Sequence, residues 1–473
     1  MTDVVPASAD RLSPALIRIA LVAGLGSLIL NLGTTTLNVA LDSVIHDLDT
    51  TLSVAQWAVT GFLLSLTLVL PTFRWMTERV GMKRLYIASL VGYTATSLLC
   101  AGAWSIESLI VFRIAQGAIG GLLTPIAQAL TARHAHGTQM GRLLSIVAIP
   151  VLVAPLLGPL VGGLLVQVFS WRAIFLFNVP VGVLCAAMCA RVLPRDEEPP
   201  DRTRRLDITG LALLSPGLAL FVYGISSIRS GSGSGSPDTV IACFGAAAVS
   251  IAAFVVHARR APGTALLDLR LFRNSTVRAA LGAYVLTSFA TFGAQLVLPL
   301  YYQQVRGQTP MGVGLLLAPQ GIGMLLTMPR VGRLTDRYAP GRIVIAGVSM
   351  TLLGTVAFCF ASETTSLWLL SLSLVVRGAG LGASNNPTLT AVYRSLPKSE
   401  VANATTALNV VQRMGAPLGT VLLAVILAWR TSAASSLSSA FAQAFVACLV
   451  LNALTIIPAL FLVRDPRTPR SNA

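Results

Sequence analysis

The chain has 473 residues, of which 11% are charged and 54% hydrophobic, whereas a soluble domain is about one quarter charged. This composition excludes an ordinary water-soluble enzyme, because a globule of this size could not cover its surface with so few polar side chains. The net charge of +16 raises nucleic acid as a partner, but the placement of the charge along the chain decides against it.

Apolar segments long enough to cross about 30 Å of hydrocarbon as helices follow one another along the chain. Ten of them carry no charge, namely 19–41, 50–73, 85–106, 143–171, 173–190, 208–228, 239–256, 279–305, 307–329 and 343–362. Three more hold one arginine each, and these are 108–132, 364–393 and 401–429. The last runs over about 441–463. We therefore predict an all-α membrane protein with 14 transmembrane helices.

The basic residues sort by side of the membrane when the N-terminus is placed in the cytoplasm. Of the 34 Lys and Arg residues, 27 then fall in cytoplasmic loops and three within the membrane. The outer loops hold only Arg172, Arg229, Arg306 and Arg430. This bias predicts a multi-pass protein of the inner (plasma) membrane with both termini cytoplasmic.

Tryptophan and histidine positions give further expectations. All six tryptophans lie near proposed helix ends, where an amphipathic ring meets the headgroups: Trp57, Trp75, Trp104, Trp171, Trp368 and Trp429. The four histidines, His46, His134, His136 and His257, lie at loops or helix ends and are expected to be solvated. We expect no metal site and no cofactor.

Three landmarks recur in order, which indicates an internal repeat. The charged segment Glu78 to Arg84 returns as Asp336 to Arg342, at an offset of 258 residues. Arg113 returns as Arg377, and the Gly/Pro-rich stretch of 143–171 returns in 401–429. Two six-helix bundles, 17–192 and 275–464, then flank an inserted helix pair with its linkers, 193–274, and the tails are 1–16 and 465–473. Repeated halves around a central site are typical of transporters with alternating access.

On these residues the sequence resembles the major facilitator superfamily, and within it the fourteen-helix drug/proton antiporter branch of multidrug efflux proteins. The family motifs correspond to Glu78 to Arg84, to Phe112-Arg113 with Gln116-Gly117, and to Ala154-Pro155 with Gly158-Pro159 and Gly162-Gly163. Branch-level matches are Ser170 to Arg172, Leu206-Asp207 with Gly210, and Asp268 to Phe272. The resemblance implies the major facilitator fold and a secondary transporter that exports drugs or other small amphiphiles in exchange for protons.

The loop expected after the second helix combines a carboxylate, basic residues and a glycine turn. Such a loop can bridge helix ends on the cytoplasmic face and form a lock that breaks when the halves rock. The gating candidates are Glu78, Arg79, Gly81, Lys83 and Arg84, with Asp336 and Arg337 in the second half. The alternative is that these charges only set the topology. The family motif opens with glycine, and here that place is taken by Arg74.

Two further groups of candidates lie within the membrane. Pro155, Gly158, Pro159, Gly162 and Gly163 predict a hinge with close helix packing, and the alternative is ordinary membrane-helix packing. By resemblance, the buried polar residues would line a central cavity and take part in proton coupling or anion binding: Arg113, Gln116, Arg377 and Arg413. The alternative for the arginines is a buried guanidinium satisfied by backbone carbonyls.

The main departure from the branch is in the first helix, where Gly33 stands in place of the usual aspartate. No Asp or Glu lies deep within any proposed span, so neutral side chains are the candidates for substrate binding: Asn31, Thr34, Asn38, Gln295, Asn385 and Asn409. This predicts a preference for neutral or anionic amphiphiles over strongly cationic dyes.

The expected partners are the lipid bilayer, a small-molecule substrate and protons, with no nucleic acid, and the protein is expected to be a monomer. The sequence has no nucleotide-binding loop, metal-ligand cluster, Gly-x-Ser-x-Gly elbow or buried acid pair, so we expect no catalytic residue and no enzyme. The alternatives are an exporter of a specific metabolite, siderophore or lipid, an uncoupled facilitator, and a membrane receptor or enzyme on a transporter scaffold.

Overall fold

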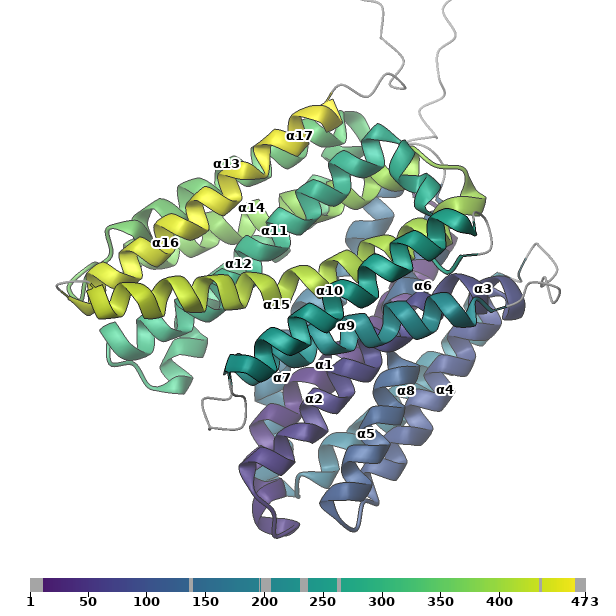
Figure 1. Ribbon diagram of the computed structural model, residues 1–473, viewed down its shortest axis with the longest axis horizontal. Coiled ribbons are helices and arrows are strands. Elements are labelled where there is room, and N and C mark those ends of the chain that lie inside the picture. The colour runs from purple at the N-terminus through teal and green to yellow at the C-terminus, as the bar shows by residue number, and fades with distance from the viewer. Residues whose placement is uncertain are drawn as a thin grey trace, which may run out of the picture. The chain divides into compact units, whose positions relative to one another are not determined.

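The computed structural model describes residues 12–135, 139–194, 196, 206–229, 237–261, 265–433 and 436–463 (Figure 1). Over these ranges the chain is helical and has no strand, which confirms the all-α prediction for them. Most of the predicted N-terminal tail, 1–16, and the predicted C-terminal tail, 465–473, lie outside the described residues.

The helices follow one another with short connections. Those before residue 261 are α1 (Pro14–Asp47), α2 (Leu52–Val69), α3 (Phe73–Val80), α4 (Met82–Ala101), α5 (Ile106–Gly120), α6 (Leu123–His134), α7 (Met140–Val168), α8 (Arg172–Val192), α9 (Ile208–Arg229) and α10 (Pro237–Arg260). Those after it are α11 (Ser275–Leu300), α12 (Pro310–Arg337), α13 (Pro340–Cys359), α14 (Leu367–Arg394), α15 (Val401–Ala433), α16 (Leu437–Leu454) and α17 (Ile456–Val463). Among the described residues, 11 helical stretches are long and apolar enough to cross a membrane.

Helical structure continues past two of the predicted helix ends, at residues 73 and 329, and includes the charged residues that follow them. The predicted loop 78–84 is helical on both sides of Gly81, because a short 3-10 turn, Leu70–Thr72, joins α2 to α3 and α4 begins at Met82. Glu78 and Arg79 therefore lie in α3, and the prediction that they lie in a loop is wrong. Asp336 and Arg337 likewise form the end of α12. A helix adds about 1.5 Å per residue, so it can leave the hydrocarbon and keep its backbone hydrogen bonds while its side chains reach water.

The chain forms two compact units. The first contains residues 1–219, 250–268 and 398–406, and the second contains 220–249, 269–397 and 407–473. In the first unit α1 packs on α7 and α8, α2 on α5, and α4 on α5 and α8. In the second, α11 packs on α16 and α17, α12 on α14, and α13 on α14, α16 and α17. The packing of α2 on α5, of α4 on α5 and α8, and of α1 on α8 thus has counterparts in α12 on α14, α13 on α14 and α16, and α11 on α16.

Two side chains expected to face solvent or headgroups make specific contacts in the first unit. Trp171 stands at the start of α8 but is only 2% exposed, and its indole Nε1 donates to Asp47 Oδ2 at 2.9 Å, so its ring packs inside the protein and does not face outward. His257 is not simply solvated, since its Nε2 lies 2.9 Å from Asp207 Oδ1. Asp207 also caps α9 by accepting from the backbone N–H of Gly210 at 2.7 Å, and so joins the start of α9 to the end of α10.

Candidate functional site: buried arginines and helix-end networks

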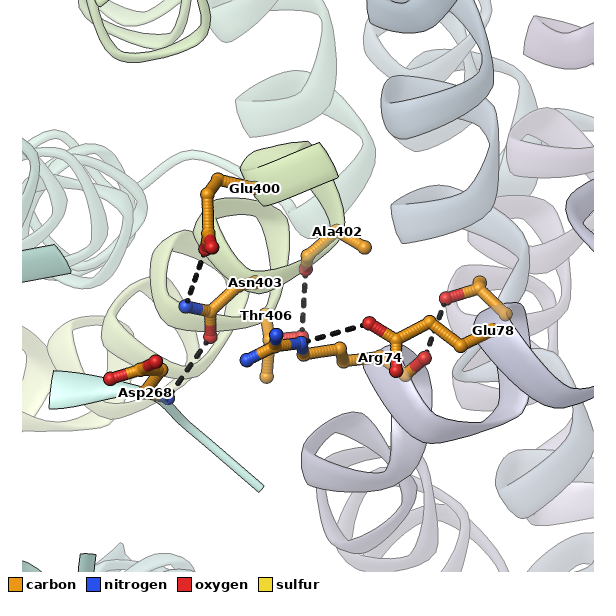
Figure 2. A network of polar contacts seen from close by, with 8 residues as sticks. Arg74, Glu78, Asp268, Glu400, Ala402, Asn403 and Thr406 are labelled. Atoms are coloured by element: carbon orange, nitrogen blue, oxygen red, sulfur yellow. Dashed lines mark hydrogen bonds and ion pairs between the residues drawn. The ribbon is translucent and has the colours of Figure 1, made fainter. Parts of the chain in front are cut away.

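Arg74 and Glu78 form an ion pair along α3, one helical turn apart. Arg74 Nε donates to Glu78 Oε1 at 3.1 Å, and the arginine is only 8% exposed. Figure 2 shows the guanidinium directed toward the first turn of α15, where Thr406 Oγ1 donates to the Ala402 carbonyl at 3.0 Å. A helix N-terminus carries partial positive charge, which disfavours a nearby cation. The negative charge of the Glu78 carboxylate offsets the positive charge of Arg74 near the start of α15.

Asn403 connects the start of α15 to the segment that begins at Asp268. Its Oδ1 accepts from the backbone N–H of Asp268 at 3.2 Å, and its Nδ2 donates to Glu400 Oε2 at 3.2 Å (Figure 2). Asn403 is completely buried. One amide therefore joins the branch-level segment beginning at Asp268 to the first turn of α15, a role that sequence reasoning missed because an asparagine in a helix carries no such signal.

Gly81 makes the turn between α3 and α4 and receives the segment that follows α8. Its φ of +90° is in the left-handed region that favours glycine, and a Cβ there would lie 2.3 Å from Asp196 Oδ2. Lys83 binds the same segment, through its backbone N–H to Asp196 Oδ1 at 3.1 Å and through Nζ to the Leu193 carbonyl at 2.5 Å. The structure thus brings Gly81 and Lys83 together and leaves Arg84 exposed.

In the second unit, Asp336 is bound by an arginine that sequence reasoning had assigned only to topology. Arg394 NH2 donates to Asp336 Oδ1 at 2.8 Å, and Arg394 NH1 donates to the Thr335 carbonyl at 2.9 Å. The Asp336 side chain is 4% exposed, and Arg337 beside it is exposed. This pair joins the end of α12 to the end of α14.

Arg113 is fully buried in the first unit, and neutral groups accept hydrogen bonds from its Nε and NH1. Its Nε donates to the Ala58 carbonyl of α2 at 3.1 Å, and NH1 donates to Gln116 Oε1 at 2.7 Å. Its guanidinium carbon lies 3.8 Å from the centre of the Phe62 ring. Gln116 also binds α4, since its Nε2 donates to Ser97 Oγ at 2.6 Å. The alternative reading, a buried arginine held partly by a backbone carbonyl, accounts for the Nε contact.

Arg377 occupies the equivalent place in the second unit with a different partner. Its NH1 donates to Gln320 Oε1 of α12, and the arginine is 1% exposed. Gln320 stands 258 residues after Phe62, so the same helix position faces the arginine in both repeats. The repeat offset leads from Phe62 to this partner once the contact of Phe62 with Arg113 is known. Arg413 is half-buried on α15 and lies near the neutral Tyr284 of α11.

The predicted hinge lies within α7, which is one continuous helix from Met140 to Val168. A Cβ on Gly162 would lie 3.2 Å from Thr36 Cα of α1, so this glycine permits the close packing of α1 on α7. Gly158 is buried and Gly163 half-buried. The side chains of Pro155 and Pro159 lie outside the described residues.

The substrate-binding candidates are divided between the units. In α1, Asn31 Nδ2 donates to the Ser27 carbonyl at 2.7 Å and Thr34 Oγ1 to the Asn31 carbonyl at 2.6 Å, while the side chain of Asn38 lies outside the described residues. In the second unit Gln295 is exposed on α11, Asn385 is half-buried on α14, and Asn409 is 7% exposed on α15.

Two tyrosines reach from α4 to two glycines of α1, in a pattern that the sequence did not predict. A Cβ on Gly26 would lie 2.2 Å from the Tyr86 hydroxyl, and one on Gly33 would lie 2.3 Å from the Tyr93 hydroxyl. Tyr86 Oη donates to the Ala23 carbonyl at 2.5 Å. Tyr93 Oη is buried and has no hydrogen-bond partner among the described residues. The position of the expected aspartate is therefore filled by a neutral hydroxyl.

Comparison with known proteins shows the family to which the chain belongs. The family profile described as Major Facilitator Superfamily matches residues 23–420. The Multidrug resistance protein B homolog of Mycobacterium tuberculosis is 38% identical over 423 residues, which cover 89% of this chain and 78% of that protein.

Two solved structures share the fold. The human organic anion transporter MFSD10 (TETRAN) gives a TM-score of 0.65 at 17% identity, covering 95% of this chain and 100% of that chain. The proton:xylose symporter XylE bound to 6-bromo-6-deoxy-D-glucose gives 0.64 at 14% identity, covering 93% and 96%.

Proposed function

Because the chain belongs to the Major Facilitator Superfamily, we propose that it exports drugs or other small amphiphilic compounds by alternating access, coupled to protons. Family membership makes it a multi-pass membrane transporter and not an enzyme. The relative named as a multidrug resistance protein homolog supports drugs as the cargo. The inner membrane is the proposed location, with both termini in the cytoplasm.

The proposal rests on the arginine that each unit buries at an equivalent place. Arg113 and Arg377 both lie more than nine-tenths buried on equivalent helices, and the groups that contact them are amide oxygens, a backbone carbonyl and aromatic rings. Burying a guanidinium within a membrane costs free energy, so a buried arginine in a membrane-spanning helix indicates a functional role. Neutral surroundings leave its positive charge available to an anionic or acceptor group, which supports neutral and anionic amphiphiles as substrates.

The proposed topology has fourteen transmembrane helices. Besides the 11 apolar stretches, α4, α7 and α9 have 20, 29 and 22 residues and are long enough to cross. We place the two six-helix bundles at 17–192 and 275–464, with the inserted pair at 193–274 between them. The polar helix ends around Glu78 and Asp336 serve as cytoplasmic gates, and the glycines of α7 serve as the hinge. A monomer is the proposed functional form.

The test is a transport assay in everted membrane vesicles with a panel of cationic, neutral and anionic compounds. We expect uptake of neutral and anionic amphiphiles that stops when the pH gradient is collapsed with an ionophore. The same vesicles without the protein provide the control. Better transport of ethidium-like cations than of neutral and acidic compounds would contradict the proposed substrate preference.

An uncoupled facilitator or an exporter of one metabolite, siderophore or lipid is the second candidate. The observation that favours uncoupled transport is Gly33, because the first helix carries no carboxylate at the place where the Tyr93 hydroxyl lies. Uptake that ignores the collapsed gradient would support this candidate, and uptake of a single compound from a broad panel would support a specific cargo.

A further inference from the structure

One face of α12 in the second unit is left exposed and ends in two arginines. The helix packs mainly on α14. Ile322 is 49% and Leu326 is 59% exposed, and Arg330 and Arg333 are exposed as well. Spacings of four, four and three residues place these four side chains on one face of the helix. An exposed apolar stripe therefore leads to a pair of guanidinium groups.

The positive charge of this pair is not balanced within α12. Arg330 NH1 donates to the Leu326 carbonyl of its own helix at 2.8 Å, which is a neutral partner. The single acid in the sequence of α12 is Asp336, whose carboxylate is bound by Arg394 and is 4% exposed. The end of this face therefore carries a net positive charge that can attract an anion.

The shared fold of the two halves does not require arginines at these places. The positions 258 residues earlier are Thr72 and Trp75, so the basic pair occurs in the second half alone. The bias of basic residues toward the cytoplasm accounts for charge at this end of α12. It does not account for the alignment of both arginines with the exposed apolar stripe, which calls for a reason of its own.

The length of the stripe matches one leaflet of a bilayer. Ile322 and Arg333 are 11 residues apart, or about 16 Å at 1.5 Å per residue. Half of the hydrocarbon core is about 15 Å thick. An acyl chain can therefore lie against Ile322 and Leu326 while its headgroup reaches the arginines. Guanidinium groups bind phosphate oxygens through strong, charge-assisted hydrogen bonds.

We propose that this face of α12 binds an anionic phospholipid of the cytoplasmic leaflet, with Arg330 and Arg333 on its phosphate and Ile322 and Leu326 along one acyl chain. A zwitterionic lipid carries a cation in its own headgroup and gains less from two arginines. The bound lipid covers the exposed stripe and stabilises the second unit. This inference rests on the proposed topology, which places the end of α12 in the cytoplasm, and not on the cargo or on proton coupling.

The experiment measures lipid binding to the full chain in detergent, by native mass spectrometry and by the shift in melting temperature. The probe is phosphatidylglycerol, and the comparison lipid is phosphatidylcholine. The wild-type protein should bind phosphatidylglycerol in preference and melt higher with it. Arg330→Gln with Arg333→Gln should weaken this binding about ten-fold or more, because each basic residue near an anionic headgroup strengthens the attraction several-fold. Arg330→Lys with Arg333→Lys keeps the charge and should bind more tightly than the glutamine variant.

The matched control is Arg259→Gln with Arg260→Gln. It removes two exposed arginines from the end of α10 and changes the net charge by the same amount, so binding should stay within about two-fold of wild type. Equal weakening by both glutamine variants would show attraction to net charge alone and would overturn the inference. A wild-type protein that binds the two lipids equally would also overturn it. The transport assay in everted vesicles reports on the proposed function separately, so either result leaves that function standing.

Discussion

At the scale of single residues, the two buried arginines show how one position can be satisfied in two ways. Phe62 places a ring over Arg113, and Gln320 at the equivalent position offers an amide oxygen to Arg377. The ring attracts the cation through its quadrupole, and the amide accepts a charge-assisted hydrogen bond. The partner residue therefore sets how strongly each guanidinium is held.

Replacing Gln320 tests how much its amide stabilises the second unit. Gln320→Leu removes the acceptor of a buried guanidinium, so the free energy of unfolding should fall by about 1–3 kcal/mol, measured by thermal unfolding in detergent. The control is Gln295→Leu, which changes an exposed glutamine of α11 and should have an effect within about 0.5 kcal/mol. Equal melting temperatures for the two variants would show that the Arg377 contact adds no stability.

Asp47 gives a prediction about pH. Hydrogen bonds from Arg172 and from the Trp171 indole lower the pKa of the Asp47 carboxyl. Because the pKa is lower in the folded than in the unfolded protein, the pair stabilises the fold above the unfolded pKa of about 3.9, and this contribution is lost as pH falls through the folded value. Asp47→Asn should therefore lower the melting temperature at pH near 7 and lose its effect in acid.

The control for this titration is Asp42→Asn on the same helix. Asp42 is highly exposed and lies 3.8 Å from His46, so its replacement should change the melting temperature little at any pH. If Asp47→Asn kept the same deficit down to pH 3, well below the normal carboxyl pKa, the stabilisation would come from packing and not from charge.

At the scale of the elements, close helix contacts depend on glycines at particular places. A Cβ on Gly354 of α13 would lie 2.4 Å from the backbone nitrogen of Arg377, and the Gly162 contact joins α7 to α1. Small residues let helix backbones approach within a membrane, where no hydrophobic force drives them together. The glycine motif of α7 therefore has a packing role in this conformation, and its role as a hinge stays a prediction.

Gly162→Leu tests the contact between α1 and α7. The leucine side chain would collide with Thr36, so overpacking should cost about 1–3 kcal/mol and transport should fall strongly. Gly321→Leu on α12 is the matched control, since a Cβ at Gly321 would meet nothing within 4 Å. Comparable transport by both variants, at equal amounts in the membrane, would argue against a tight contact at Gly162.

At the scale of the whole molecule, the proposed orientation of the chain rests on its basic residues and can be tested by labelling. Glu363, between α13 and α14, and Lys398, just before α15, are both exposed. The proposed topology places them on opposite faces of the membrane. In a background without the native cysteines, Glu363→Cys should react with a membrane-impermeant maleimide in intact cells. Lys398→Cys should react only after permeabilisation, and the reverse pattern would invert the proposed topology.

How far the sequence could predict the molecule depends on the kind of feature. Apolar length and composition predicted the helices well, because lipid forces the backbone into them. The ends of α3 and α12 were misjudged, since charge marks the edge of the hydrocarbon and not the end of a helix. The partners of Arg113 and Asp336 could not be derived, because contacts such as Arg394 with Asp336 depend on helix rotation and packing. The offset of 258 residues relates Gln320 to Phe62, but it identifies Gln320 as the partner of Arg377 only once the contact of Phe62 with Arg113 is known.

The contacts of Tyr86 with Gly26 and of Tyr93 with Gly33 restrict how α1 and α4 can move. Both rings sit against glycines with the same seven-residue spacing, so axial sliding between the two helices lifts both rings at once. The next register in which a tyrosine meets a glycine again is about 10 Å away, at 1.5 Å per residue. These two contacts prevent α1 from sliding along α4. The two helices therefore move as one rigid body, and the conformational change takes place at other helix–helix contacts.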